Sequence, residues 1–577
     1  MRTHIVLWAA IAAIPASAAI SVSLDHTGPA HRGVGELIGW SAAVSGTNNP
    51  VFFRFRARIP GELEFRTIQD FGTESRIDWT FSEYEGPLDM EATAMDRVTG
   101  EQASAIVSVQ LLSRAVGGAV VNATAHPLVK LYSAPACADA GRIRVQVSRD
   151  GQPAFATPWK DCSPWHSMNF LLAGMRASTA YRAVHEVERN GEIVRSGEGV
   201  EFVTGEASGQ YIEHNSPDPL SGPQSILLSA PLFPNRPTAT DAEGRLIWYY
   251  PGSVSLLTRT QNGKFWGLIQ SPGSKAMQKI REFDLTGMTL RETNAERVND
   301  HITPHGHTPI SGFHHEVFEL PDGRILALAS AEHLTTGLQG DGEVNILSDV
   351  ILVMDRDLNV IWHWDGFDYL DPRRKAILDE KCSIGACPPL FLTADANDWT
   401  HANSVQLTPD GHFLISVRHL DNLLKINYSN GSGDGVVLWE FGKDGHFQLE
   451  GGNADDWFSH QHDAQMLDER TLLLFDNSNT RYQTNRSATS RGQVFQLDET
   501  ARTARLLLNV DLGVYSFALG SAQRLESGAY YFGIGWLLPD NLARGVEVDA
   551  NGREVGTSTL SRPAYRSFRL RDLYTTP

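Results

Sequence analysis

A turn followed by an apolar strand repeats along the second part of the sequence. The unit occurs as TQNGKFWGLI, LPDGRILALA, TPDGHFLISV, LDERTLLLF and LESGAYYFGI, with turn positions at Gly263, Gly323, Gly411, Arg470 and Gly528. The spacing is about sixty residues, with one longer insertion. Such self-similarity is typical of a β-propeller, in which each repeat is one small sheet. Six four-stranded blades fit residues 208–577.

A second repeated element is an apolar strand that ends near a tryptophan. It occurs as GRLIWYY, LNVIWHWDG and GVVLWEFG, so we expect Trp248, Trp362 and Trp439 to pack between blades. The C-terminal segment SFRLRDLY is a candidate for the last strand of the first blade. That pairing would close the ring and remove exposed sheet edges.

Residues 19–207 carry a different β pattern, with short alternating strands between Gly, Pro, Asn and Asp. VFFRFRARI, AIVSVQLLS and RIRVQVS are examples. We predict an all-β protein with two β-sandwiches, at 19–118 and 119–207, before the six-bladed propeller. The second sandwich has the closing pattern of a fibronectin III-like domain. These sandwiches could bind a partner, but nothing in them concentrates reactive groups, which favours a spacer role.

The N-terminus has the layout of a signal peptide. MRTH is followed by the apolar IVLWAAIAAI and by PASA, which predicts residues 1–18 as a signal peptide cut after Ala18. An uncleaved anchor is the alternative, but the apolar run has about half the length of a bilayer span. We therefore expect an exported chain, periplasmic or secreted, without a membrane span after cleavage.

The formal net charge of −19 limits the possible partners. Recognition of nucleic acid or of an anionic membrane depends on a basic face, so neither is expected here. An anionic substrate would need a local cationic pocket. Homo-oligomers are compatible with the sequence.

Four cysteines form two candidate disulfides, Cys137 with Cys162 and Cys382 with Cys387. Export makes disulfides chemically reasonable. Zinc is the alternative for these thiols, although neither pair has a repeated C-x-x-C spacing.

Three polar residues share one position of the repeat. His315, Asn403 and His462 each lie eight residues before the turn position of their unit. Equivalent positions of radially arranged blades point toward one axis, so we expect these side chains to meet. A single histidine before a strand is usually structural, but agreement in three units favours a shared site.

From Tyr211 onward the motifs resemble those of the bacterial arylsulfotransferases. HHEVFELPDGR, DWTHANSVQLTPDGHFLISVRH, LWEFG and QHDAQMLDERTLLLFDN occur in the family's order. The family consists of exported propeller enzymes that move a sulfuryl group between phenols. The resemblance implies that His462 is the sulfated nucleophile, that His401 and Asn403 form the H-x-N pair, and that Arg418 and His315 complete the site.

Two features depart from the family pattern. Arg470 replaces the usual turn glycine, which leaves the chemistry intact. Two N-terminal sandwiches stand where familiar members have a single β-rich domain, which leaves the oligomeric state and the outer substrate contacts open.

These residue types suit sulfuryl transfer from a phenolic sulfate ester. Neutral imidazole has a free lone pair, so His462 can attack sulfur, and Asp463 or another acceptor could fix its tautomer. Arg418 offers a planar charged fork to the sulfate oxygens. Asn403 and His315 can donate hydrogen bonds, and His401 can protonate the leaving phenolate. The scheme needs no cofactor and no metal.

Several alternatives remain at this stage. Arg418 could form a salt bridge across blades, and Trp399, Trp457 and Phe458 could wall a phenol cleft or pack in the core. His301, His305 and His307, together with His460 and His462, could bind zinc or copper, although H-x-H spacing alone is a weak indication. A quinone- or metal-dependent propeller enzyme and a nonenzymatic exported binding protein are the competing functions.

Overall fold

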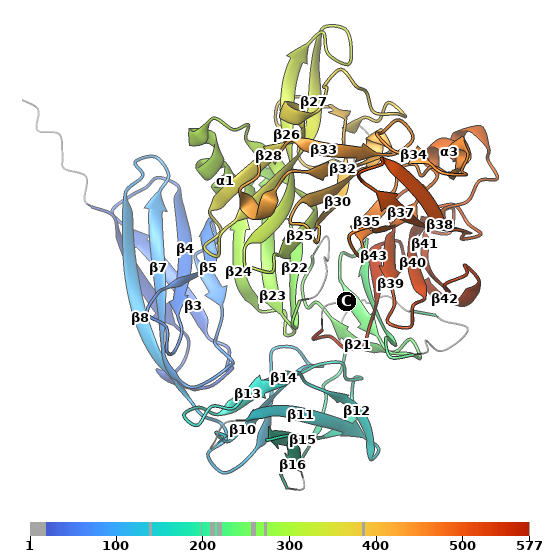
Figure 1. Ribbon diagram of the computed structural model, residues 1–577. Coiled ribbons are helices and arrows are strands. Elements are labelled where there is room, and N and C mark those ends of the chain that lie inside the picture. The colour runs from blue at the N-terminus through green and yellow to red at the C-terminus, as the bar shows by residue number, and fades with distance from the viewer. Residues whose placement is uncertain are drawn as a thin grey trace, which may run out of the picture.

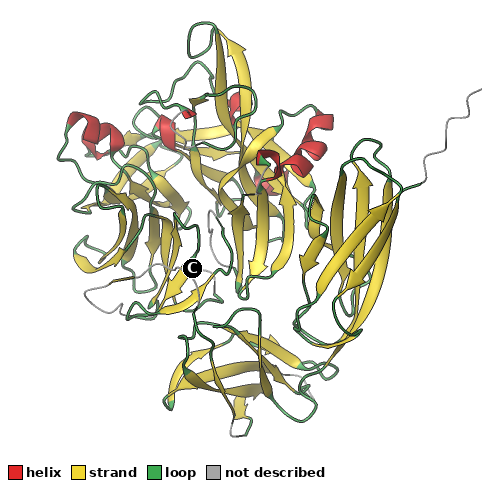
Figure 2. Ribbon diagram, turned by 180° about the vertical axis from the view of Figure 1, so that it is seen from behind, coloured by secondary structure: helices red, strands yellow, loops and turns green. Residues whose placement is uncertain are grey.

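The computed structural model describes residues 19–137, 141–197, 199–207, 214–215, 222–254, 261–270, 274–382 and 387–575. Strands dominate these residues and helices are short, which confirms the all-β prediction (Figure 1, Figure 2). The predicted signal peptide, residues 1–18, lies outside the described residues. None of the helices in the described ranges is long and apolar enough to cross a membrane.

The first part of the chain forms two sheets around one core. One sheet contains β1 Ser21–His26, β3 Gly39–Ser45 and β6 Arg76–Asp78, and the other contains β2 His31–Gly33, β8 Gln102–Leu112, β7 Gly86–Asp96, β4 Val51–Arg58 and β5 Arg66–Gly72. Alternate residues of β4, among them Phe53, Phe55 and Ala57, point into the shared core because successive strand residues face opposite sides. This is the alternation that the sequence displays in VFFRFRARI.

The next part forms two further sheets with a separate core. They contain β9 Val120–Ala123, β10 Lys130–Ala134 and β14 Met168–Leu172 in one sheet, and β11 Arg142–Arg149, β12 Gln152–Ala156, β13 Lys160–Asp161, β15 Ala180–Arg189, β16 Glu192–Arg195 and β17 Val200–Val203 in the other. In Figure 1 these strands lie below the rest of the chain.

The predicted disulfide between Cys137 and Cys162 is wrong in this structure, because both cysteines are free. Burial and the neighbouring Cys162 thiol raise the pKa of Cys137 to about 12. The second predicted disulfide, Cys382–Cys387, is present.

One sheet of the N-terminal part continues into the repeat region, which the sequence did not predict. Strand β5 pairs in parallel with β24 Thr289–Asn294 through Gln69 and Glu292, and β24 is followed in the sheet by β23 Lys279–Asp284 and β22 Lys264–Ile269. Asp70 also accepts a hydrogen bond from Thr293 Oγ1 at 3.0 Å. The two parts are therefore joined by hydrogen bonds. Figure 1 shows β5 and β24 side by side.

The remaining strands form successive sheets of four or five strands each, antiparallel except for the β27–β29 and β34–β38 pairs. They are β19 Ile226–Pro231, β20 Thr238–Thr240, β21 Leu246–Tyr249 and β43 Ala564–Leu570; β25 Ile310–Glu319, β26 Ile325–Thr336, β27 Glu343–Met354, β28 Val360–Asp365 and β29 Asn397–Asp398; β30 Ala402–Leu407, β31 Phe413–Val417, β32 Asn422–Ile426 and β33 Val437–Phe441; β34 Gln448–Leu449, β35 His462–Met466, β36 Thr471–Asp476, β37 Arg491–Asp498 and β38 Thr503–Asp511; and β18 His214–Asn215, β39 Ser521–Arg524, β40 Tyr530–Leu537, β41 Leu542–Val548 and β42 Glu554–Leu560.

Short helices connect some of these strands (Figure 2). They are α1 Ala295–Ile302, α2 Gly366–Tyr369 and α3 Asn479–Thr484, with 3-10 turns η1 Lys275–Met277, η2 Thr303–His305, η4 Arg418–Leu420, η5 Ser429–Gly431 and η6 Ala454–Asp456.

The pairing predicted for the C-terminal segment is present. Strand β43 lies antiparallel to β19, with Leu228 opposite Phe568. The chain end thus completes the sheet that opens the repeat region.

The predicted tryptophans pack between neighbouring sheets. Trp248 stacks on Phe265 with ring centroids 4.8 Å apart, and Trp362 meets Phe413 edge-on at 5.7 Å. Trp439 lies in a core cluster with residues of the following sheet. Aromatic contacts of this kind fill the space between sheets and stabilise their arrangement.

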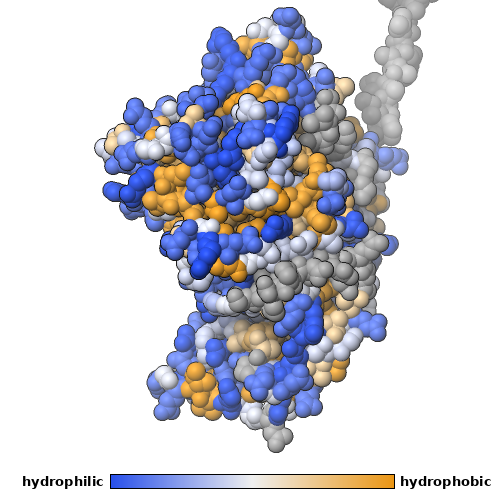
Figure 3. Space-filling model, turned by 90° about the vertical axis from the view of Figure 1, so that its right-hand side faces the viewer, coloured by the Kyte–Doolittle hydropathy of each residue, from blue (hydrophilic) through white to orange (hydrophobic). Residues whose placement is uncertain are grey.

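The surface differs from this interior. The face in Figure 3 carries many hydrophilic side chains with apolar patches between them. This is compatible with the net charge of −19.

Candidate active site

Three histidines predicted from the sequence come together in the structure. The rings of His315 and His401 lie 5.0 Å apart, centroid to centroid, and both rings are electrostatic neighbours of His462. His462 is 2% exposed, whereas His315 and His401 keep part of their surface accessible. The site is therefore buried at His462 and reachable at the other two rings.

The backbone is irregular where these histidines lie. His315 and His401 have φ of 52° and 48°, in the left-handed region that residues with a Cβ rarely adopt. The β25–β26 ladder is interrupted between Phe313 and Val317, around His315, and the β30–β31 ladder is interrupted between Ala402 and Ser404, just after His401. Bulges redirect side chains at strand ends, and backbone strain of this kind is common in functional sites.

The His462 ring is held in one tautomer. Its Nδ1 lies 2.6 Å from Asn477 Oδ1 and 3.2 Å from the carbonyl oxygen of His460. Both partners are acceptors, so Nδ1 carries the proton and Nε2 keeps its lone pair. Burial and then the neighbouring Arg418 cation lower the pKa of His462 well below its usual value. The ring is thus a neutral base.

The acceptor is Asn477 rather than Asp463, the residue named in the sequence analysis. The Asn477 amide group donates to the carbonyl oxygens of Ser516 at 2.9 Å and Leu519 at 3.0 Å, which turns its oxygen toward His462. Asp463 instead accepts from the Ala522 backbone N–H at 3.0 Å. Nothing in the local sequence distinguishes Asn477 from other polar residues after a strand.

Arg418 is a buried cation beside these histidines. Its Nη2 donates to the Phe517 carbonyl oxygen at 3.1 Å, and Nη1 contacts Nε2 of His419. The Nε atom is buried without a hydrogen-bond partner. Burial lowers the pKa of Arg418. A desolvated guanidinium with a donor to spare is suited to an anion.

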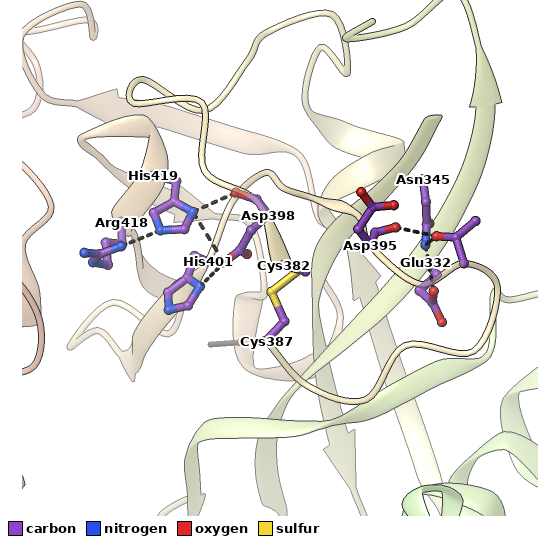
Figure 4. The surroundings of a disulfide bond; sticks show 10 residues. Glu332, Asn345, Cys382, Cys387, Asp395, Asp398, His401, Arg418 and His419 are labelled. Atoms are coloured by element: carbon purple, nitrogen blue, oxygen red, sulfur yellow. Dashed lines mark hydrogen bonds and ion pairs between the residues drawn. A yellow bond between two sulfur atoms is a disulfide. The ribbon is translucent and has the colours of Figure 1, made fainter. Parts of the chain in front are cut away.

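A carboxylate orients the His401 ring. Asp398 Oδ2 lies 2.7 Å from His401 Nδ1, which leaves Nε2 as the free nitrogen. His419 stacks on His401 at 4.4 Å and donates from Nδ1 to the Asp398 carbonyl oxygen at 2.6 Å. Figure 4 shows Arg418, His419, His401 and Asp398 as one chain of contacts next to the Cys382–Cys387 disulfide.

Asn403 lies in the same region, fully buried. Its Nδ2 donates to the Gln461 carbonyl oxygen at 2.6 Å, so one of its two amide hydrogens is committed to the backbone. Its Oδ1 has no hydrogen-bond partner. The carbonyl oxygen of Asn403 accepts from Tyr565 Oη at 2.9 Å.

Comparison with known proteins identifies the family. Residues 218–562 match the family described as Arylsulfotransferase (ASST), which is more than half of the chain. The chain belongs to this family. The matched segment contains all five predicted site residues: His315, His401, Asn403, Arg418 and His462.

The chain is also similar to a curated arylsulfotransferase. Arylsulfate sulfotransferase AssT of Escherichia coli O6:H1 strain CFT073 is 24% identical over 296 residues, which are 42% of this chain and 46% of the relative. The alignment thus spans less than half of that protein.

Two solved structures share a partial likeness. The FN1-FN3 domains of chicken CNTN1 are 11% identical, with 33% of this chain and 69% of theirs covered and a TM-score of 0.14. The chicken interferon gamma receptor alpha chain is 8% identical, with coverages of 33% and 100% and a TM-score of 0.13. Neither superposition bears on the fold.

A buried ion pair that the sequence did not predict lies next to the candidate site. Arg566 on β43 contacts both carboxylate oxygens of Glu316, at 3.0 and 2.7 Å, and its Nη2 also donates to the Asn403 carbonyl oxygen at 2.8 Å. Arg566 thereby joins the last strand to β25 and β30. No motif marks this arginine, because its partners are some 160 to 250 positions away.

Three aromatic residues that were candidates to line a phenol cleft pack in hydrophobic cores instead. Trp399 is fully buried and Phe458 is 2% exposed, each within a hydrophobic core cluster. Trp457 is partly buried and packs edge-on against Phe441. Core packing accounts for all three.

Two groups that contain histidines resemble metal sites by distance. Glu380, His419 and His460, and likewise Asp398, His401 and His419, bring ligand atoms within 4.8 Å of one another. However, His419 uses Nδ1 on the Asp398 carbonyl oxygen and Nε2 on Arg418. Ring nitrogens engaged in this way do not offer a lone pair to a metal.

The second histidine run does not join the site. His305 Nδ1 lies 2.9 Å from the His301 carbonyl oxygen, and His307 stacks on His363 at 4.0 Å. In the described part of the chain, no metal-like group includes these three histidines.

Proposed function

We propose that this chain is an aryl sulfotransferase that moves a sulfuryl group from a phenolic sulfate ester to a phenolic acceptor through a sulfohistidine at His462. The observation that carries the proposal is the fixed tautomer of His462, whose Nε2 lone pair lies in a buried site beside the Arg418 guanidinium. Neutral imidazole next to a fixed cation is suited to attack an anionic ester. Family membership supports the same activity.

In the first half-reaction, His462 Nε2 attacks sulfur and the bond from sulfur to the aryl oxygen breaks. The electron pair leaves with the phenolate, which takes the Nε2 proton of His401, whose ring enters the step as an imidazolium with its Nδ1 proton on Asp398 and leaves it neutral. By analogy with phosphoryl transfer, positioning and stabilisation of the sulfate oxygens govern the rate. The Arg418 guanidinium and the His315 ring serve this role, and the remaining Asn403 amide hydrogen supports it.

In the second half-reaction, an acceptor phenol loses its proton and its oxygen attacks sulfur. The bond from sulfur to His462 Nε2 breaks, and the electron pair returns to the ring. Donor and acceptor thus use the site in turn, which is a ping-pong mechanism. The scheme uses no diffusible nucleotide and no resident metal.

The proposed architecture is a six-bladed β-propeller at 208–577, preceded by sandwiches at 19–118 and 119–207 and by a signal peptide at 1–18. Contacts between edge strands of consecutive sheets support the ring. Strand β22 contacts β25, β25 contacts β30, β30 contacts β35, β35 contacts β39, and β39 contacts β43. The β19–β43 pairing supports closure. We also propose that the enzyme is exported, either to the periplasm or out of the cell, and that it can form homo-oligomers.

Incubation of the purified chain with an aryl sulfate alone tests the proposal. We expect mass analysis to find one sulfuryl group on the peptide containing His462, and no label after His462→Ala. The exposed His446 provides a matched control, so His446→Ala should be labelled like the wild type. Label on another residue would identify that residue as the nucleophile. An intact fold without labelling or transfer would favour the nonenzymatic alternative. Bound quinone or stoichiometric metal in active protein would favour the other enzyme classes.

A further inference from the structure

A chain of three side chains leads from the candidate site into the core. His314 is 6% exposed, with Nε2 3.1 Å from Asp349 Oδ1 on one side and Nδ1 2.8 Å from His315 Nδ1 on the other. Asp349 is fixed in turn, because its Oδ2 accepts from the Ala402 backbone N–H at 2.6 Å. The mechanism proposed above assigns no role to His314.

The short distance between the two histidine Nδ1 atoms limits how many protons these three side chains can hold. Two nitrogens 2.8 Å apart share one proton, since two protons would collide and none would leave two lone pairs facing each other. With Asp349 ionised, we assign a proton to His314 Nε2, which faces the carboxylate at 3.1 Å as an ion-pair contact without hydrogen-bond geometry, and His314 accepts at Nδ1. His315 then donates from Nδ1, and its Nε2 keeps a lone pair on the side of the site.

The groups around His315 oppose a positive charge on its ring. They are the rings of His314, His401 and His462 and the Arg566 guanidinium. Desolvation, then His314 and then the other histidines lower the pKa of His315 well below its usual value. A proton accepted at Nε2 is therefore stabilised only if the charge moves one ring further, to His314 beside Asp349.

We propose that Asp349, His314 and His315 form a proton relay in which His315 Nε2 takes the proton of the acceptor phenol and His314, a positioning residue, carries the resulting charge next to Asp349. The inference rests on the proposed function and assigns the base of its second half-reaction. The phenol O–H bond breaks and an N–H bond forms at His315 Nε2. The proton on His315 Nδ1 shifts to His314 Nδ1, and the phenolate oxygen bonds to sulfur as described above.

The cycle closes without another reactant. His401 gives up one proton to the leaving phenolate, and His315 gains one from the acceptor. The two ring centroids lie 5.0 Å apart, and return of the proton from His315 to His401 before the next turnover completes the proposed cycle.

Another histidine pair supplies a matched control. His333 Nε2 lies 3.1 Å from Asp365 Oδ2, the same distance as in the His314–Asp349 pair, and His333 stacks on Phe367 rather than on a site histidine. His333→Gln thus removes a similar ion pair from the same sheet outside the proposed relay.

The test measures the two half-reactions separately in His314→Gln, Asp349→Asn, His333→Gln and the wild type. Labelling of His462 by an activated aryl sulfate reports the first half-reaction, and chase of the label with phenols of different acidity reports the second. We expect labelling of the two relay variants to persist. Transfer to weakly acidic phenols should fall on the order of a hundredfold, with a smaller fall for acidic phenols that are already ionised.

The pH dependence separates a relay from a structural role. The loss in His314→Gln should shrink as pH approaches the phenol pKa of about 10, because the acceptor then arrives without its proton. His333→Gln should behave as the wild type. An equal loss for all acceptors at all pH values, loss of labelling together with transfer, or no loss at all would overturn the relay. Absence of His462 labelling in the wild type would instead contradict the proposed function.

Discussion

Asn477 Oδ1 accepts the Nδ1 proton of His462 at 2.6 Å, and this contact fixes which ring nitrogen faces the site. The two residues lie side by side at the open end of one hairpin, His462 at the start of β35 and Asn477 just after β36. The Asn477 amide is itself held by two backbone carbonyl oxygens. The orientation of the His462 lone pair thus depends on a residue that need not contact substrate.

Asn477→Leu should slow labelling of His462 on the order of a hundredfold, because the ring can then rotate or change tautomer. Stopped-time mass analysis of the His462 peptide measures the rate. Asn509→Ala, at an exposed residue outside the site, is the control and should label normally. Unchanged labelling in Asn477→Leu would show that the tautomer is set by something else.

Arg418→Lys keeps the charge but loses the planar fork. We expect the value of kcat/KM to fall about a hundredfold to a thousandfold, the range seen when one fixed donor to a developing anion is removed. Steady-state kinetics with one aryl sulfate and one phenol provide the measurement. The exposed Arg505→Lys should keep wild-type kinetics. Wild-type kinetics in Arg418→Lys would contradict the sulfate-binding role.

Acid should destabilise the fold through buried neutral histidines such as His126. Burial lowers the pKa of His126 to about 4, and its Nε2 lies 2.8 Å from the Tyr249 carbonyl oxygen. Since the unfolded ring titrates near 6.5, the unfolded state binds more protons between these two values. The contribution of His126 to the free energy of unfolding is fully present above pH about 6.5. It is lost as the pH falls toward 4, and the loss is roughly 3 kcal/mol in all.

Urea unfolding at several pH values tests this contribution. His126→Gln should have a shallower fall in the free energy of unfolding between pH 7 and pH 5 than the wild type. The exposed His446→Gln should reproduce the wild-type slope. Equal slopes in His126→Gln and the wild type would remove His126 as the source.

The Arg566–Glu316 pair should be costly to break on one side only. Arg566→Met leaves a buried carboxylate without its partner, and we expect a loss of about 3–5 kcal/mol in the free energy of unfolding. Combining it with Glu316→Leu should recover part of the loss. The more exposed Arg142–Glu188 pair is the control, and Arg142→Met should cost no more than about 1 kcal/mol. An Arg566→Met loss as small as the control's would mean that water reaches the pair.

Much of the fold could be predicted because it follows from local patterns. The turn glycines Gly323 and Gly411 adopt the positive φ expected of them, at 86° and 81°, and apolar strands follow both. Alternation in VFFRFRARI predicted which side of β4 is buried. The β5–β24 pairing was not predictable, because a single parallel bridge between distant strands leaves no periodic pattern.

By itself, the sequence determined the strand pattern, the repeat and three site positions in register, His315, Asn403 and His462, because short-range spacing encodes them. Only the tertiary structure decided how each site side chain is held. Asn477 on His462, Asp398 on His401 and Arg566 on Glu316 are contacts between side chains, which depend on the angles and bulges of packed sheets. The free Cys137 belongs to the same class, since the burial of a thiol is a property of the assembled core.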